Sequence, residues 1–130
     1  MIEFHLDVRS GVPTYLQLVQ QVRQAVRLGI LVPGDQLPTV KEVVGRLAIN
    51  PNTVLKAYRE LDHERLVEGR RGQGTFVCSE SPSLPPDEVK GLRSQLQRWV
   101  TQARAAGLDD DNMAALFADT VRQPASEAAA

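Results

Sequence analysis

The 130-residue chain has a single cysteine and no long apolar run. Cys78 cannot form a disulfide within the chain, and one thiol does not provide a set of metal ligands. No stretch approaches the roughly 20 apolar residues of a membrane span, and no apolar signal-peptide core follows Met1. We therefore expect a cytoplasmic protein that does not enter a membrane and holds no metal or other cofactor.

Groups typical of catalysis are also scarce. His5 and His63 lie in unrelated segments, and the sequence contains no phosphate-binding loop, nucleophile motif or metal-ligand cluster. The acidic run at 109–111 could suggest a cation site, but acids at a helix start are the ordinary explanation. The sequence therefore argues against an enzyme.

Charge of one sign is not in excess either, because the net charge is −1. Its distribution is uneven, however: residues 1–78 carry ten Lys/Arg and eight Asp/Glu, a net of +2. Residues 79–130 carry five and eight, a net of −3. A chance distribution of charged residues over the surface would explain this difference. A basic surface for nucleic acid would have to be a local patch in the first part of the chain.

A proline-rich stretch, SESPSLPPDE at residues 79–88, divides the chain. Its three prolines cannot continue a helix or join the interior of a sheet, which predicts a linker. The final PASEAAA has too little apolar bulk to pack. We expect a first domain over 1–78, a linker over 79–86, a helical segment over 87–123 and a flexible tail over 124–130.

Two helices are predicted early in the first domain. Between Pro13 and about Leu28, apolar residues recur at helical spacing along one side, namely Leu18, Val19, Val22, Ala25 and Val26. The segment VPGDQLP then interrupts the pattern. Thr39 and Glu42 have the spacing of a capping box, which starts a second helix with the apolar side Val40, Val43, Val44 and Leu47.

The segment NPNTVLKAYREL, residues 50–61, predicts a third helix with a polar start. Asn50 is a favoured N-cap and Pro51 suits the first helical position. At about 100° per residue, one side collects Val54, Ala57, Tyr58 and Leu61. The opposite side carries Asn52, Lys56, Arg59 and His63, with Thr53 beside it. A solvated helix face and a nucleic-acid surface both fit this pattern.

A short hairpin follows. The β-forming segments LVEG and GTFVC are joined by RRGQG, in which Gly72 and Gly74 allow a tight turn. Arg70 and Arg71 place two positive charges at the tip and have no predicted packing role; a merely soluble turn is the alternative. Three helices and a basic hairpin describe a winged helix-turn-helix, a mainly α fold with a small β-hairpin. In that fold the helix over 50–64 enters the DNA major groove, and the wing over 70–75 contacts the backbone or minor groove.

Residues 29–77 resemble the winged-helix domain of the GntR family of bacterial transcription regulators, and NPNTV.KAYREL resembles its YtrA-like subfamily. The preceding PTYLQL, with Pro13, Tyr15 and Gln17, matches the family's first helix. The resemblance implies a homodimer that binds double-stranded operator DNA and represses its own operon, often alongside transporter genes. A winged helix used for protein–protein contact without operator binding is the alternative. No small-molecule effector is identified from the sequence.

The resemblance also implies contacts at the start of the second and third helices. The family's Ser-x-Arg pair is Thr39 and Lys41 here, which keeps the charge but loses the planar guanidinium fork. Pro51 stands where many relatives have an arginine, so that base-reading contact cannot be made. These departures affect which bases the protein can recognise more than they affect its ability to bind DNA.

Further positions match within the third helix and the wing. Thr53 matches the family threonine, Gly72 matches the wing glycine with Arg71 before it, and Arg65 replaces the usual glycine after the third helix. Arg65 either adds charge or alters the turn. The predicted DNA-binding residues are Thr39, Lys41, Asn50, Asn52, Thr53, Lys56, Arg59, Arg70, Arg71, Gly72, Gln73 and Gly74.

The segment after the linker predicts two amphipathic helices. Apolar residues alternate at steps of three and four from Val89 to Ala106, Gly107 ends this helix, and Asp109 can cap the next. Two such helices cannot bury both faces as a free hairpin, so they pack on the first domain or on a second chain. Operator palindromy favours dimerisation. The predicted interface is Val89, Leu92, Leu96, Trp99, Ala103, Met113, Leu116 and Phe117.

Overall fold

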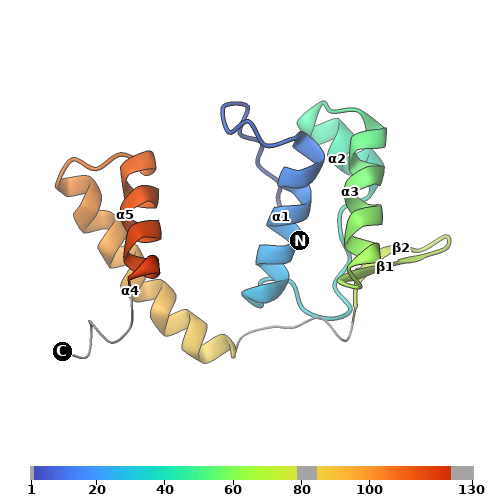
Figure 1. Ribbon diagram of the computed structural model, residues 1–130. Helices are drawn as coiled ribbons and strands as arrows, with labels where there is room; N and C mark the ends of the chain where they lie inside the picture. Colours follow the sequence, from blue (N-terminus) through green and yellow to red (C-terminus); the bar gives the residue numbers. More distant parts are fainter. Residues whose placement is uncertain (1, 79–84, 124–130) are drawn as a thin grey trace. The chain divides into compact units, whose positions relative to one another are not determined.

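The computed structural model describes residues 2–78 and 85–123 of the chain (Figure 1). Two compact units are present, Met1–Pro86 and Asp87–Ala130. Residues 79–84 of the predicted linker and the predicted tail lie outside the described residues, and the last predicted linker residue, Pro86, begins a helix. The elements are α1 (Thr14–Arg27), α2 (Val40–Leu47), α3 (Pro51–His63), β1 (Val67–Arg70), β2 (Gly74–Val77), α4 (Pro86–Ala105) and α5 (Asp110–Arg122).

Two helices of the first unit, α2 and α3, start where their capping residues predict. The Thr39 hydroxyl accepts a hydrogen bond from the Glu42 N–H at 3.1 Å, and the Glu42 carboxylate accepts one from the Thr39 N–H at 3.2 Å. Asn50 caps α3 by accepting from the Asn52 N–H at 2.8 Å, with Pro51 in the first position. Both starts therefore have a fixed geometry.

The hydrophobic core of the first unit lies between α1, α2 and α3, and α3 packs against both other helices. The predicted sides of α1 and α3 face it. The irregular N-terminal segment also contributes Ile2 and Phe4, which are 9% and 5% exposed. No periodic pattern in the sequence predicts these two core residues.

A buried amide holds the segment before α1. Gln17 is 9% exposed, and its side-chain amide donates to the carbonyls of Asp7 at 3.0 Å and Val12 at 2.9 Å. Its carbonyl oxygen accepts from the Asp7 N–H at 2.8 Å. A buried amide is tolerated only when its groups are paired, and here they are. This contact gives a structural reason for the glutamine in PTYLQL.

A hydroxyl connects α3 to the segment that leads into α2. The Tyr58 O–H donates to the Pro38 carbonyl at 2.6 Å, and burial raises the pKa of this phenol. Tyr58 therefore stays neutral and keeps its donor at physiological pH. The bond fixes α3 relative to the start of α2, where two of the predicted DNA contacts lie.

Arg65, which follows α3, is in the left-handed backbone region with φ 63°. Such a conformation costs a non-glycine residue roughly 1–2 kcal/mol. Glycine, which the resemblance to the GntR family leads us to expect here, would adopt this conformation without that cost. The left-handed turn is therefore made here without glycine. Arg65 adds an exposed charge at the expense of some backbone strain.

An ion pair joins α1 to the end of α3. The Arg23 guanidinium donates to both carboxylate oxygens of Glu64, at 2.7 and 2.6 Å. These hydrogen bonds lower the pKa of Glu64 and raise that of Arg23. The pair is bidentate and partly shielded from water, a geometry in which an ion pair stabilises a fold more than a freely exposed pair does.

We expect Glu64→Gln to lower the free energy of unfolding at neutral pH, with a loss that shrinks in acid. The folded-state pKa of Glu64 lies below an unfolded value of about 4.3. Its stabilisation is therefore complete above that value and disappears as the pH falls through the folded pKa. Urea unfolding of both proteins at about pH 7 and about pH 3 measures the difference. An equal difference at both pH values would contradict this assignment.

The second unit contains α4 and α5. Gly107, with φ 96°, lies in the turn between them, and Asp109 caps α5 by accepting from the Asn112 N–H at 2.8 Å. Ala103 and Met113, which the sequence analysis placed in the dimer interface, are buried in the single chain, each 7% exposed. Among the described residues, no helix is long and apolar enough to cross a membrane.

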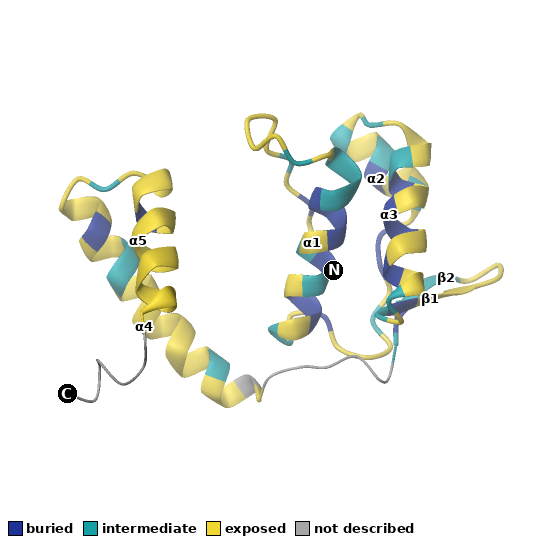
Figure 2. Ribbon diagram, in the orientation of Figure 1, coloured by how far each residue is buried: buried dark blue, intermediate teal, exposed yellow. Residues whose placement is uncertain are grey.

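Much apolar surface stays uncovered on this unit (Figure 2). Val89 and Trp99 are half-buried. The exposed large apolar residues are Leu92, Leu96, Leu116, Phe117 and Val121. Of the predicted interface residues, only those that the single chain leaves accessible can contact a second chain.

Candidate nucleic-acid interface

The start of α2 and the β-hairpin share one open surface. A depression of about 660 Å³ is lined by Thr39 together with residues 69–75. The fold thus brings Thr39 beside five predicted wing residues that are far from it in sequence, Arg70, Arg71, Gly72, Gln73 and Gly74. Lys41, in the first turn of α2, is exposed.

The accessible side of α3 carries three of the predicted polar contacts. Asn52, Lys56 and Arg59 are exposed, and Thr53 is half-buried. The hairpin projects on the side where α3 is exposed (Figures 1 and 2). Asn50 is exposed as well, although its side-chain oxygen already caps the helix. The N-terminal end of α3 adds the positive end of its dipole, which favours phosphate.

Lys56 has an aromatic partner that the sequence pattern does not predict. Its ammonium group lies 4.0 Å from the centroid of the Tyr15 ring at the start of α1. A cation–π contact of this kind is worth about 0.5–1 kcal/mol at an exposed site. Lys56 is therefore directed toward the start of α1.

The hairpin is fastened to the body of the unit by the stretch before α2. β1 and β2 pair antiparallel, with Arg70 opposite Gly74. The Gln36 amide donates to the Gln73 carbonyl at 3.2 Å, and Gln36 forms a β-bridge with Phe76. The wing is consequently held at a defined position beside α3.

The backbone conformation at the base of this turn favours glycine at position 74. Its φ of 128° is a conformation that L side chains rarely adopt. A Cβ at this position would also lie 2.6 Å from the Gln36 side-chain nitrogen, so Gln36 would have to move its amide group and give up its present position beside the wing. Gly72, at φ 75°, is constrained by its backbone alone, since no atom among the described residues lies within 4 Å of a Cβ built there.

The two wing arginines differ in their surroundings. The Arg70 guanidinium pairs with Glu68 at 2.9 Å and lies 4.3 Å from the centroid of the Phe76 ring. The prediction that the arginine pair has no packing role is therefore wrong for Arg70. Arg71 is exposed and has no ion pair or ring contact with the described part of the chain. Arg71 is the wing's unneutralised charge.

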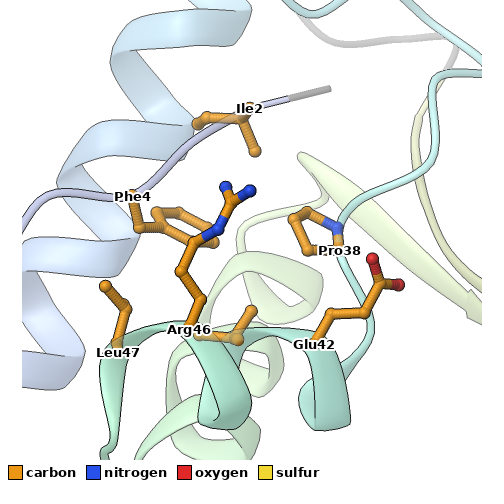
Figure 3. A pocket seen from close by; sticks show the side chains of 7 residues that line it. Ile2, Phe4, Pro38, Glu42, Arg46 and Leu47 are labelled. Atoms are coloured by element: carbon orange, nitrogen blue, oxygen red, sulfur yellow. The ribbon is translucent and has the colours of Figure 1, made fainter.

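A second concave region lies on α2 and the N-terminal segment (Figure 3). It has a volume of about 280 Å³ and is lined by Ile2, Phe4, Pro38, Glu42, Val43, Arg46 and Leu47. Glu42 already belongs to the capping box, and Arg46 lies 3.5 Å from Glu3. Within residues 2–78 and 85–123, no three His, Cys, Asp or Glu side chains are grouped to hold a metal ion.

Comparison with known proteins identifies the family. The profile of bacterial regulatory proteins of the gntR family matches residues 14–77, from the first residue of α1 to the last of β2. The HTH-type transcriptional repressor YtrA of Bacillus subtilis (strain 168) is 37% identical over 105 residues, which are 80% of this chain and 81% of YtrA. The chain belongs to the GntR family.

Solved structures agree with this assignment. YtrA from Sulfolobus acidocaldarius, a GntR-family transcription factor, has a TM-score of 0.53 at 28% identity over 91% of this chain and 96% of that one. AraR(DBD) in complex with operator ORR3 has a TM-score of 0.50 at 25% identity over 59% of this chain and 93% of that one. This GntR-family protein is a DNA-binding transcription regulator, not an enzyme. The winged helix-turn-helix fold with two C-terminal helices is confirmed.

Three side chains around the site of this GntR-family regulator were not predicted to belong to it. Gln36 and Phe76 position the wing, and Leu55 is a large apolar residue exposed on α3. Leu55 could have been found from its spacing, since it follows Asn52 by three residues and therefore shares its side of the helix. Gln36 and Phe76 act through tertiary contacts that leave no pattern in the sequence.

Proposed function

We propose that this GntR-family protein is a homodimeric repressor that acts in the cytoplasm on an operator upstream of its own operon. The N-terminal half of α3 enters the major groove, and the wing contacts the backbone or minor groove. The observation that carries this proposal is the shared surface of Thr39 and the wing beside the exposed side of α3. Control of its own operon, often alongside transporter genes, is what the resemblance to the YtrA-like subfamily implies.

The side chains divide by chemistry into two groups. Thr39, Lys41, Thr53 and Arg71 provide hydroxyl and cationic donors suited to phosphate, which fixes the position of the protein on the duplex. Asn52 and Arg59 lie on α3, where amide and guanidinium groups can pair with base edges. The glycines of the wing let its backbone approach the DNA closely.

Two features support dimerisation, the exposed apolar residues of the second unit and the symmetry expected of an operator. A two-fold operator requires two winged domains, and a C2 interface uses the same surface on both chains. Leu92 and Phe117 are 64% and 52% exposed, more than a stable hairpin of two helices would leave to water. A second copy of the chain would cover them.

A gel shift with the DNA upstream of the chain's own gene tests the proposal. We expect retardation of this fragment at protein concentrations at which a random fragment of equal length stays free. Typical specific complexes exceed non-specific ones by about 10³-fold or more in affinity at physiological salt. Equal retardation of both fragments would contradict operator recognition at that locus.

Arg71→Ala should weaken binding to operator and random DNA alike and reduce the slope of log affinity against log salt by about 1 per protomer. Arg71 carries an unneutralised charge, whereas Arg70 is already paired with Glu68. Arg70→Ala should therefore change the slope less. Fluorescence anisotropy titrations across a salt series measure both slopes. A larger effect of Arg70→Ala would reverse these assigned roles.

Asn52→Ala should cost about 1–3 kcal/mol of binding free energy on the operator and much less on random DNA. Its side chain is exposed on α3, and the cap of that helix is made by the Asn50 side chain, so the fold is kept. Competition binding against both DNAs measures the difference. Equal losses on the two DNAs would assign Asn52 to backbone positioning.

A further inference from the structure

The recognition helix presents one apolar side chain among its polar ones. Among the residues of α3, all of which the structure describes, Leu55 is the only large apolar side chain in the exposed class, at 42%. The other apolar residues of the helix, Val54, Ala57, Tyr58 and Leu61, are at most 7% exposed. Leu55 therefore does not belong to the core.

The contacts of neighbouring residues show which side Leu55 occupies. Tyr58 and Asp62, three and seven residues later, share its side of the helix. Tyr58 bonds to the Pro38 carbonyl before α2, and the Asp62 carboxylate accepts from the Gly69 N–H of β1 at 3.4 Å. Leu55 thus lies on the side of α3 that meets the start of α2 and the hairpin. Lys56, the next residue, lies about 100° further round the helix and contacts Tyr15 of α1.

Pro38 directly precedes Thr39, and Gly69 lines the depression that Thr39 shares with the wing, so this side of α3 adjoins that surface. Asn52 precedes Leu55 by one helical turn, and Arg59 follows by another, donating to the Leu55 carbonyl at 3.4 Å. A leucine in this row can neither donate nor accept a hydrogen bond through its side chain. It can only make apolar contact with the surface that Asn52, Leu55 and Arg59 face.

We infer that Leu55 is a specificity-determining residue that recognises the 5-methyl group of a thymine in the operator. The inference rests on the proposed function. The thymine methyl is the apolar group that a base pair presents in the major groove. Opposite any other base edge, Leu55 would remove water from a donor or acceptor without replacing its hydrogen bond, and that loss disfavours the wrong base.

Removing the methyl group tests this contact without changing base pairing. The probes are fluorescein-labelled duplexes of the upstream operator in which each thymine in turn, with its symmetry mate, is replaced by deoxyuridine. Burial of one methyl group corresponds to about a 4-fold change in affinity per half-site, or roughly 15-fold for a symmetric operator. We expect the wild-type chain to show this loss at one thymine position of the half-site.

Leu55→Ala should bind the unmodified operator more weakly by a similar factor and should lose no further affinity when that thymine becomes deoxyuridine. Leu55→Met, which keeps an apolar side chain, should retain part of the discrimination. Ile30→Ala is the matched control, because Ile30 is also exposed, at 57%, but lies after α1. Its binding should follow the wild type, and circular dichroism should show all variants folded.

Two results would overturn the inference. The wild-type chain could bind every deoxyuridine duplex as tightly as the unmodified operator, or Leu55→Ala could keep the full penalty at the sensitive thymine. Both results leave operator binding itself intact. If the wild-type chain instead fails to distinguish the unmodified operator from random DNA, the proposed function fails in that first titration, and the role of Leu55 fails with it.

Discussion

A chain that ends at Cys78 should be a monomer and should bind the operator at least about 100-fold more weakly than the full chain. In the proposed dimer each winged domain contacts one half-site. Binding of the first domain would hold the second near its own half-site, so the second binding event would be intramolecular. Removal of α4 and α5 abolishes this advantage and leaves each domain's own contacts unchanged.

The shortened chain should remain folded, because the core cluster of the first unit uses residues between Ile2 and Val77 only. Ending at Cys78 also keeps the hydrogen bond from its N–H to the Leu66 carbonyl at 2.9 Å. Sedimentation velocity gives the oligomeric state, and circular dichroism reports folding. A shortened chain that still sediments as a dimer would exclude α4 and α5 as the interface. An unfolded one would show that these helices stabilise the winged domain itself.

Point substitutions test the same interface in the full chain. Leu96→Asp with Trp99→Asp introduces two charges on the apolar side of α4 and should also give a monomer. Ser94→Asp with Thr101→Asp is the matched control, since it adds the same charges on the opposite side of the helix, where both residues are exposed. The control should remain a dimer. Monomers in both cases would mean that added charge, and not loss of apolar contact, separates the chains.

Leu61→Ala should lower the free energy of unfolding by about 2–5 kcal/mol. Leu61 is 0% exposed, on the side of α3 that faces the core. Its truncation removes apolar contacts and leaves a cavity that neighbouring side chains fill only in part. For a domain of this size, the loss is a large fraction of the 5–15 kcal/mol of total stability typical of proteins.

Leu55→Ala is the matched control for this experiment, because it makes the same chemical change in the same helix. Leu55 is exposed, so its substitution should change stability by no more than about 0.5 kcal/mol. Urea unfolding followed by circular dichroism measures both variants. The two substitutions should therefore have different effects. Leu61→Ala should lower the stability of the fold, and Leu55→Ala should weaken DNA binding. Similar stability losses for both would mean that Leu55 belongs to the core.

Helix boundaries were largely predictable, because they depend on local chemistry. The capping box of Thr39 and Glu42, the cap at Asn50 and the cap at Asp109 each fix a helix start within a few residues of chain. The buried sides of α1 and α3 were equally predictable, since apolar residues repeat there with the helical period. The winged fold follows from this order of elements.

Contacts between distant segments were not predictable. Ile2 and Phe4 enter the core from an irregular segment that has no period to recognise. The contacts of Lys56 with Tyr15 and of Arg70 with Phe76 depend on how helices and strands pack, and each changes the meaning of a predicted site residue. Ala103 and Met113 belong to an apolar pattern. Such a pattern does not show whether a residue is buried within its own chain or against a partner chain.

A DNase I footprint of the full chain on the DNA upstream of its own gene tests the central claim most directly. Two winged domains held as a dimer should protect two inversely repeated half-sites centred about one helical turn apart, roughly 10–10.5 base pairs. Arg71→Ala should protect the same positions at higher protein concentration. Protection of a single half-site, or uniform protection that ignores sequence, would contradict a dimeric repressor that reads its operator through α3 and the wing.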